Sequence, residues 1–197
     1  MNISRSLAIY LYPGLIWALW IAWVAYWQVA SSGNKPTVRR EAPASRASHI
    51  APLLAGVILL IERPSFTPWL ASAVLPADFT TYWIGVALIA GGLGFAVWAR
   101  RHLGSNWSGT VTVKQEHQLI CTGPYGRVRH PIYTGLLLAL LGSAVARADI
   151  QGFIGFAICV AALIRKLRIE ERWMLAQFGT SYSLYVARTR ALLPLLY

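Results

Sequence analysis

The chain alternates long uncharged runs with short polar segments. The longest run, Leu7–Val29, holds 23 consecutive uncharged residues, and Phe79–Ala99 holds 21 more. A helix rises 1.5 Å per residue, so each run is long enough to cross a hydrocarbon core of about 30 Å. Both runs therefore predict transmembrane helices.

Three shorter apolar runs predict three further crossings. The run His49–Ile61 has 13 residues, so its helix must begin earlier, within the polar segment that precedes it. The runs Ile132–Ala146 and Ile150–Ile164 have 15 residues each and are separated by only three, Arg147, Ala148 and Asp149. Such a short connection predicts an antiparallel helical hairpin. The hairpin helices must then extend into flanking polar residues or lie in a locally thinner bilayer.

The remaining segments predict structure at the membrane surface. Residues 65–76 are apolar but bounded by prolines, which favours an interfacial or re-entrant stretch over a full crossing. Residues 165–197 begin with a charged helical segment and end in a short apolar tail. We therefore expect an all-α, polytopic membrane protein of about five transmembrane helices. We divide it into residues 1–99, with three helices, and 100–197, which belong to the same integrated domain.

Composition supports a membrane protein. Hydrophobic residues make up 56% of the chain and charged residues only 13%, whereas soluble domains carry about 25% charged residues. Nine Trp and nine Tyr fit aromatic belts at the two membrane interfaces. The first run is too long for the roughly 7–15 apolar residues of a signal peptide, so we interpret it as a retained helix, with cleavage near Ala30 as the minor alternative.

The charge pattern predicts orientation rather than nucleic-acid binding. The net charge is +11, but the Lys and Arg residues lie in short segments between apolar runs. Five crossings put residues 31–48, 100–131 and 165–197 on one side, which then holds fifteen Lys and Arg against three on the other. The positive-inside rule makes that side cytoplasmic, with the N-terminus outside and the C-terminus inside. Membrane lipids, not nucleic acid, are the expected surroundings.

Candidate chemistry concentrates on this cytoplasmic side. Glu170 and Glu171 are two of only seven acidic residues, and they follow the last apolar run within a basic cluster. His130 precedes Pro131, which starts a helix well, and a helix N-terminus favours an anion. The structural alternatives are topology anchors and a surface ion pair between Lys166 and Glu170 at i,i+4 spacing. Cys121 and Cys159 lack the spacing of a metal site and are interpreted as small apolar residues.

At this point the sequence resembles a known family, the isoprenylcysteine carboxyl methyltransferases and their relatives the phospholipid N-methyltransferases. The matching pieces are L-G-S-N-W-S at 103–108, H-Q-L-I at 117–120, G-P-Y at 123–125, R-H-P-I-Y at 129–133 and E-E…F-G-x-x-Y-x-x-Y at 170–185. The resemblance covers about the last hundred residues. It implies a cofactor pocket at the cytoplasmic face, enclosed by the helical hairpin and the C-terminal helix, that binds S-adenosylmethionine.

The resemblance also implies roles for individual residues. The family's cofactor contacts fall on His117, Gln118, Leu119, Ile120, Tyr125, His130, Pro131, Ile132, Tyr133 and Glu170. Its substrate-side Arg falls on Lys166, which lacks the planar fork that binds a carboxylate through two hydrogen bonds. Lys166, Glu170 and Glu171 are the expected catalytic residues, and Glu171 or His117 is the candidate base for an amine acceptor.

We therefore expect a membrane methyltransferase that uses S-adenosylmethionine and acts on a lipophilic acceptor, foremost an isoprenylcysteine-type carboxylate. A phospholipid amine is the alternative acceptor. Two other functional hypotheses stay open. One is an NADPH-dependent protein similar to sterol reductases, although these are usually much longer. The other is a non-catalytic membrane binding protein, which the cost of idle polar groups near lipid disfavours.

Overall fold

The fold is a bundle of long helices with a small strand pair at one end. The computed structural model describes residues 3–31, 37–62, 67–107, 112–114 and 119–192. The α-helices are α1 (Ile3–Ser31), α2 (Pro43–Ile61), α3 (Phe79–Leu103), α4 (Pro131–Arg147), α5 (Ile150–Phe178) and α6 (Thr180–Arg188). Three short 3-10 helices are η1 (Pro68–Ala71), η2 (Gly104–Asn106) and η3 (Gly123–Gly126). The strands are β1 (Thr37–Arg40) and β2 (Thr112–Lys114).

The predicted membrane helices are confirmed. Four of the described helices, α1, α2, α3 and α5, are long and apolar enough to cross a membrane, and α4 is a shorter apolar helix. α2 begins at Pro43, so it does take residues from the polar segment before its apolar run. The charged segment after Ile164 continues α5 without a break to Phe178. Glu170 and Glu171 are thus rigidly connected to a membrane-spanning helix.

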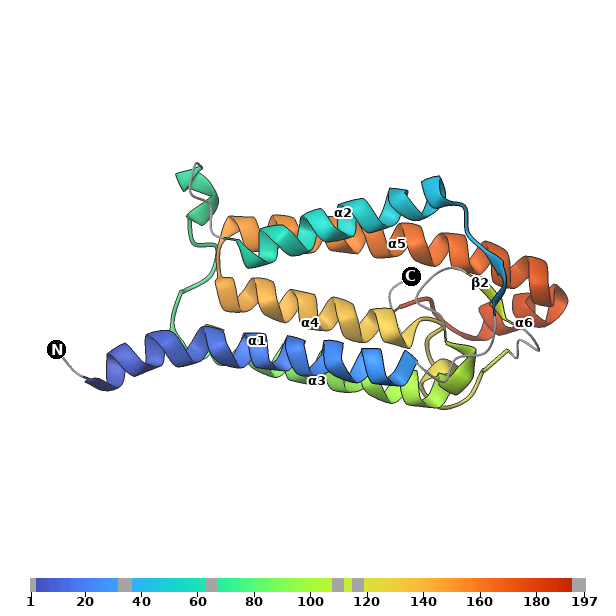
Figure 1. The fold of residues 1–197 in the computed structure, drawn as a ribbon, viewed down its shortest axis with the longest axis horizontal. Helices are drawn as coiled ribbons and strands as arrows, with labels where there is room; N and C mark the ends of the chain where they lie inside the picture. Colours follow the sequence, from blue (N-terminus) through green and yellow to red (C-terminus); the bar gives the residue numbers. More distant parts are fainter. Residues whose placement is uncertain (1–2, 32–36, 63–66, 108–111, 115–118, 193–197) are drawn as a thin grey trace.

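The helices pack in the order α1, α3, α4, α5, α2, which differs from their order in the chain (Figure 1). Successive long helices run in opposite directions, and α4 and α5 form the expected antiparallel hairpin. The described parts of the three segments that were grouped by charge, among them β2, the end of α5 and α6, lie at one end of this bundle. That end carries the candidate chemistry.

Small residues allow the helices of the bundle to approach closely. A Cβ on Gly92 of α3 would lie 2.5 Å from the carbonyl oxygen of Gly135 on α4, and Gly135 makes the reciprocal contact. Gly56 of α2 meets the Gly155 carbonyl of α5 in the same way, at 2.7 Å. Of the three neighbouring glycines in this part of α3, only Gly92 has this role, since Gly91 and Gly94 meet nothing within 4 Å. Membrane helices commonly associate through such small residues.

The hairpin turn fixes the far end of α2. The last carbonyl groups of a helix lack partners within it. Here Arg147 donates to the carbonyls of Leu60 and Glu62, at 3.1 and 2.8 Å. Gln151 donates to the carbonyls of Leu59 and Glu62, at 2.9 and 2.6 Å. Arg147 also pairs with Asp149 at 2.7 Å, so the turn between α4 and α5 caps α2.

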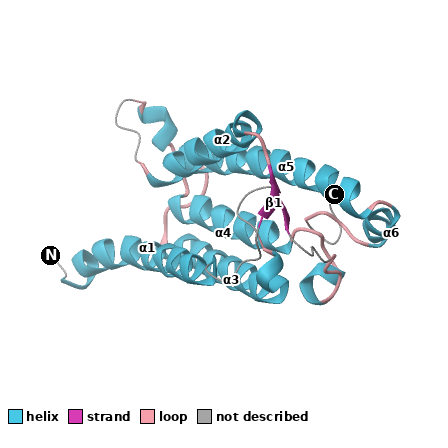
Figure 2. Ribbon diagram, turned by 45° about the vertical axis from the view of Figure 1, so that its right-hand side comes forward, coloured by secondary structure: helices cyan, strands magenta, loops and turns pink. Residues whose placement is uncertain are grey.

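The short antiparallel strand pair was not predicted from the sequence. β1 lies within the segment interpreted as a loop, and Arg40 pairs with Thr112 across the ribbon. Figure 2 shows both strands toward the end of the bundle that carries α6. The ribbon links the start of α2 to the polar segment that follows α3. Cys121 also departs from expectation, because it is exposed, whereas Cys159 is fully buried in α5.

The close helix contact predicts a large difference between two neighbouring glycines. Gly92→Ala places a methyl group against the α4 backbone, and overpacking of this kind costs about 1–3 kcal/mol. The matched control Gly91→Ala meets open space and should be neutral or slightly more stable. Thermal unfolding in detergent, followed by gel filtration, measures both. Equal melting temperatures would show that the α3–α4 contact is looser than described.

Candidate functional site

The candidate site lies where the start of α4 meets the polar half of α5. His130 stands at the N-cap position of α4, and Pro131 occupies the first turn. Tyr133, one turn into the helix, points at α5, and its hydroxyl donates to Glu170 Oε1 at 2.5 Å. The His130 and Tyr133 rings are stacked, with centroids 5.5 Å apart and planes 5° apart.

Glu170 is the centre of this cluster. Besides the Tyr133 hydroxyl, Lys166 Nζ lies 3.8 Å from its Oε1 and His130 Nδ1 lies 3.7 Å from its Oε2. The Lys166 ammonium also stands over the Tyr133 ring, 5.3 Å from the centroid. The expected i,i+4 pair therefore exists, but it faces inward. The Lys166 side chain is only 11% exposed and that of Glu170 21%.

Glu171 binds a different set of groups. Its Oε1 accepts from Arg129 Nε at 2.6 Å and lies 3.2 Å from His130 Nε2. Arg129 also donates to the carbonyl of Thr189, beyond α6, at 2.5 Å. Arg129 stands inside the R-H-P-I-Y motif, but the sequence indicated no role for it beyond membrane topology. The structure makes it the link between Glu171 and the chain after α6.

Other residues of the predicted set pack in an adjoining apolar cluster. Tyr125 and Ile132 form a buried cluster with Ala99 of α3, and Ile120 and Tyr133 pack against this cluster. Tyr133 therefore touches both the charged and the apolar groups. Leu119 is half-buried beside Ile120. His117 and Gln118 lie outside the described residues.

Sequence reasoning missed two buried polar residues, namely His49 in α2 and Glu41 just before this helix. The side chains of Glu41 and His49 are each 2% exposed, and His49 Nδ1 lies 3.7 Å from Glu41 Oε1. Ser45 donates to the same oxygen at 2.5 Å, while Glu41 Oε2 has no hydrogen-bond partner among the described residues. Because Ser48 accepts from Arg165 of α5 at 2.6 Å, His49 lies at the level of Lys166. The sequence placed both in a loop-to-helix boundary and so gave no sign of burial.

Hydrogen bonds from α6 hold the segment before α4. The Tyr185 hydroxyl donates to the carbonyl of Tyr125 at 2.6 Å, and both side chains are buried. Burial raises the pKa of Tyr125 and that of Tyr185 well above the ordinary phenol value. Tyr185 therefore stays protonated and remains a donor. Farther along, Thr134 of α4 donates to the carbonyl of Leu192 at 2.5 Å.

The chain is similar to known proteins in its family pattern, its sequence and its fold. A family model described as phospholipid methyltransferase matches residues 80–181, slightly more than half of the chain. These residues include α3, α4 and α5, and with them His130, Tyr133, Lys166, Glu170 and Glu171.

The similar curated proteins are all named as isoprenylcysteine methyltransferases. A protein-S-isoprenylcysteine O-methyltransferase of Schizosaccharomyces pombe is 27% identical over 47% of this chain and 41% of its own length. Protein-S-isoprenylcysteine O-methyltransferase B of Arabidopsis thaliana is 28% identical over 46% of this chain and 48% of its own length. The chain thus spans less than half of the length of these two relatives.

A solved structure shares the fold. It is a eukaryotic intramembrane Ras methyltransferase, an isoprenylcysteine carboxyl methyltransferase, with a TM-score of 0.55 and 22% identity. The match covers 80% of this chain and 55% of the other. It confirms the expected membrane fold, and with the apolar helices it identifies an integral membrane protein.

The buried Tyr185 hydroxyl predicts an alkaline loss of stability. A tyrosine in the unfolded chain loses its phenol proton from about pH 10, whereas Tyr185 in the folded protein keeps it. The unfolded state is therefore increasingly favoured as pH rises through that value. Tyr185→Phe should cost about 1–3 kcal/mol at neutral pH, because the Tyr125 carbonyl loses its donor. It should also weaken the alkaline decline.

Melting temperatures between pH 7 and pH 11, roughly the range around the free phenol pKa, check both effects. The control is Tyr82→Phe, because Tyr82 lies in the first turn of α3, at the other end of the bundle from Tyr185. A Tyr185→Phe variant with unchanged stability and an unchanged pH profile would contradict the hydrogen bond.

Proposed function

The chain belongs to the phospholipid methyltransferase family, and from this we propose that it is a membrane methyltransferase that uses S-adenosylmethionine and methylates a lipophilic acceptor. The first candidate acceptor is an isoprenylcysteine-type carboxylate, in keeping with the names of the similar curated proteins. The proposed site faces the cytoplasm, as the distribution of Lys and Arg predicts. The observation that carries the proposal is the cluster of His130, Tyr133, Lys166 and Glu170.

The chemistry of this cluster fits the groups of S-adenosylmethionine. Glu170 offers a carboxylate to the cofactor's ammonium, and His130 with the N-terminus of α4 suits its carboxylate. The Tyr133 ring attracts a cation, as the Lys166 ammonium 5.3 Å from its centroid shows, and a sulfonium that took the ammonium's place would be attracted in the same way. Backbone groups of the H-Q-L-I segment at 117–120 would take the adenine. When bound, the cofactor supplies an electrophilic methyl group.

The protein's own part is positioning and exclusion of water. Methyl transfer needs the acceptor's lone pair in line with the methyl carbon, and a carboxylate acceptor needs no base at neutral pH. Lys166 would attract such a carboxylate as a point charge. The apolar cluster of Ile120, Tyr125 and Ile132 adjoins the charged groups and would keep the reacting atoms dry. A lipophilic acceptor could enter laterally between helices.

A phospholipid amine is the second candidate acceptor, and one feature of the sequence favours it. Lys166 stands where the resemblance places the family's carboxylate-binding Arg. An amine acceptor must lose a proton, so it also requires a base. Glu171, which the sequence suggested as that base, is engaged by Arg129 and His130. The buried Glu41–His49 pair is a better candidate, because one Glu41 oxygen and His49 Nδ1 have no hydrogen bond among the described residues. Glu171 then acts by holding His130 in place.

The first test is cofactor binding. Glu170→Gln should weaken binding of S-adenosylhomocysteine about 10–100-fold, because a charge-assisted hydrogen bond is worth about 1.5–3 kcal/mol. Glu62→Gln, exposed at the other end of the bundle, should bind normally. Calorimetric titration of detergent-purified protein measures both, with NADPH as a second ligand. Heat from NADPH and none from S-adenosylhomocysteine would favour the reductase reading, and no heat from either a non-catalytic role.

The second test concerns the acceptor. With an isoprenylcysteine thioether carboxylate, Lys166→Arg should keep or raise kcat/KM, since the guanidinium binds a carboxylate through two donors. Lys166→Met should lower it by about tenfold or more, the loss of one buried charged contact. Steady-state methyl transfer to this acceptor and to a phosphatidylethanolamine acceptor is the measurement. Equal rates for all three proteins would exclude Lys166 from acceptor binding.

A further inference from the structure

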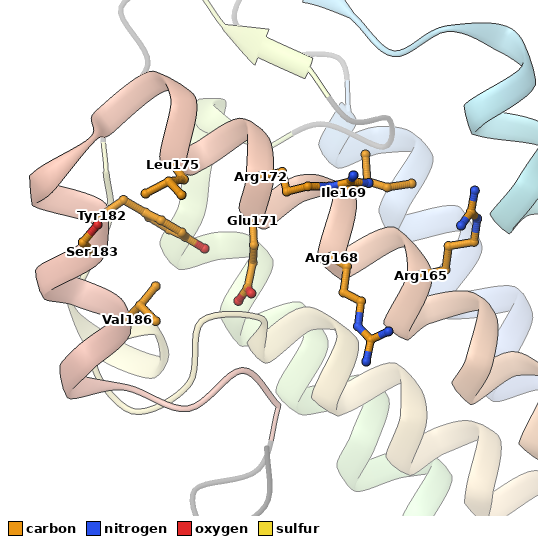
Figure 3. A pocket seen from close by; sticks show the side chains of 9 residues that line it. All are labelled: Arg165, Arg168, Ile169, Glu171, Arg172, Leu175, Tyr182, Ser183 and Val186. Atoms are coloured by element: carbon orange, nitrogen blue, oxygen red, sulfur yellow. The ribbon is translucent and has the colours of Figure 1, made fainter.

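A basic groove lies between the second half of α5 and α6, apart from the proposed active site. It has a volume of about 710 Å³. Figure 3 shows Arg165, Arg168 and Arg172 along its α5 wall and Val186 on its α6 wall. Ile169 and Leu175 add apolar surface from α5. The groove therefore combines guanidinium groups with apolar side chains.

Helical geometry separates this groove from the candidate site. At 100° per residue, Arg165, Arg168 and Arg172 fall within an arc of about 60°. Lys166 and Glu170 project at least roughly 100° away from this arc's centre, toward the space between α2 and α4. A ligand in the groove would therefore contact α5 and α6 without lying in the proposed reaction site.

The groove is electropositive. Among the described residues that line it, Glu171 is the one acidic side chain. Its carboxylate is already paired with Arg129, at 2.6 Å, and with His130, at 3.2 Å. Arg168 and Arg172 are exposed at the surface. Arg165 gives one N–H to Ser48, but a guanidinium has five donors. The guanidinium groups of Arg168 and Arg172, one turn apart on the same helix, suit a ligand with several anionic oxygens.

The groove also lies at the right level for a lipid headgroup. The apolar half of α5 ends at Ile164. The three arginines lie within the next eight residues, which span about 10 Å of helix. The headgroup layer begins where the hydrocarbon core ends. Leu175 is 49% exposed and Val186 37% exposed, although both line the groove. The arginines therefore lie at the depth of the phosphate groups, while Leu175 lies about one helical turn farther from the hydrocarbon core.

From the charge and the depth, we propose that this groove binds the phosphate headgroup of an anionic phospholipid, which bridges α5 and α6. The phosphate oxygens accept from Arg168 and Arg172, and the acyl chains leave the groove toward the apolar half of α5. The lipid is a bound stabiliser of the α6 region and not the methyl acceptor. The proposal stands whether or not the chain is a methyltransferase.

The test compares nanodiscs of phosphatidylcholine alone with nanodiscs that also contain phosphatidylglycerol. Native mass spectrometry counts retained phosphatidylglycerol, and thermal unfolding reports stabilisation. Arg168→Gln/Arg172→Gln should weaken retention about thirtyfold, because each basic residue near an anionic lipid surface contributes about a fivefold factor. The melting temperature of this variant should no longer rise with phosphatidylglycerol.

The matched control is Arg101→Gln/Arg127→Gln, which removes the same charge from exposed positions outside the groove. It should retain the lipid as the unmodified protein does. A second variant, Arg168→Lys/Arg172→Lys, preserves charge and should retain the lipid at an intermediate level, since Lys lacks the two-donor fork. Equal loss in groove and control variants would overturn the proposal, because the attraction would then be non-specific. Stabilisation by dissolved inorganic phosphate in phosphatidylcholine nanodiscs, equal to that by phosphatidylglycerol, would overturn the lipid assignment.

Discussion

Glu170 and Glu171 are adjacent on α5, and each holds a different part of the cytoplasmic-end structure. Consecutive helical residues project about 100° apart, so the two carboxylates cannot serve the same partner set. Glu170 accepts a hydrogen bond from Tyr133 and faces Lys166, inside the bundle. Glu171 accepts a hydrogen bond from Arg129, which also donates to a backbone carbonyl after α6. His130 lies between the two carboxylates and depends on both for its position.

This arrangement needs a rigid support, which the bundle provides. The polar half of α5 continues directly from its apolar half, so the two carboxylates move with a helix that packs on α2 and α4. Close contacts such as Gly92 with Gly135 and Gly56 with Gly155 fix the distances between those helices. At the far end, Arg147 and Gln151 cap α2. Polar groups near lipid are costly when unpaired, so the paired groups also specify how the helices meet.

The proposed activity and the proposed lipid site use opposite faces of the same helix. Lys166 and Glu170 face α2 and α4, where the buried Glu41–His49 pair also lies. Arg168 and Arg172 line the groove between α5 and α6, while Arg165, at the groove's far end, donates to Ser48 of α2. α6 connects the two sides, because Tyr185 holds the segment before α4 while Val186 lines the groove. A lipid that steadies α6 would therefore also steady the segment that carries His130.

The sequence alone determined the membrane class, the number of apolar helices and the hairpin, because the length and polarity of each run are properties of consecutive residues. It also indicated His130, Tyr133, Lys166 and Glu170, since these stand in short motifs that resemble a known family. Their roles toward a cofactor stay predictions.

Tertiary structure alone decided which groups meet. No local pattern pairs Arg129 with Glu171, 42 residues away, or buries Glu41 and His49 beside α5. The β1–β2 ribbon likewise depends on two segments that are distant in the chain. Periodicity shows which face a residue occupies, but the partner on that face is set by how the helices pack.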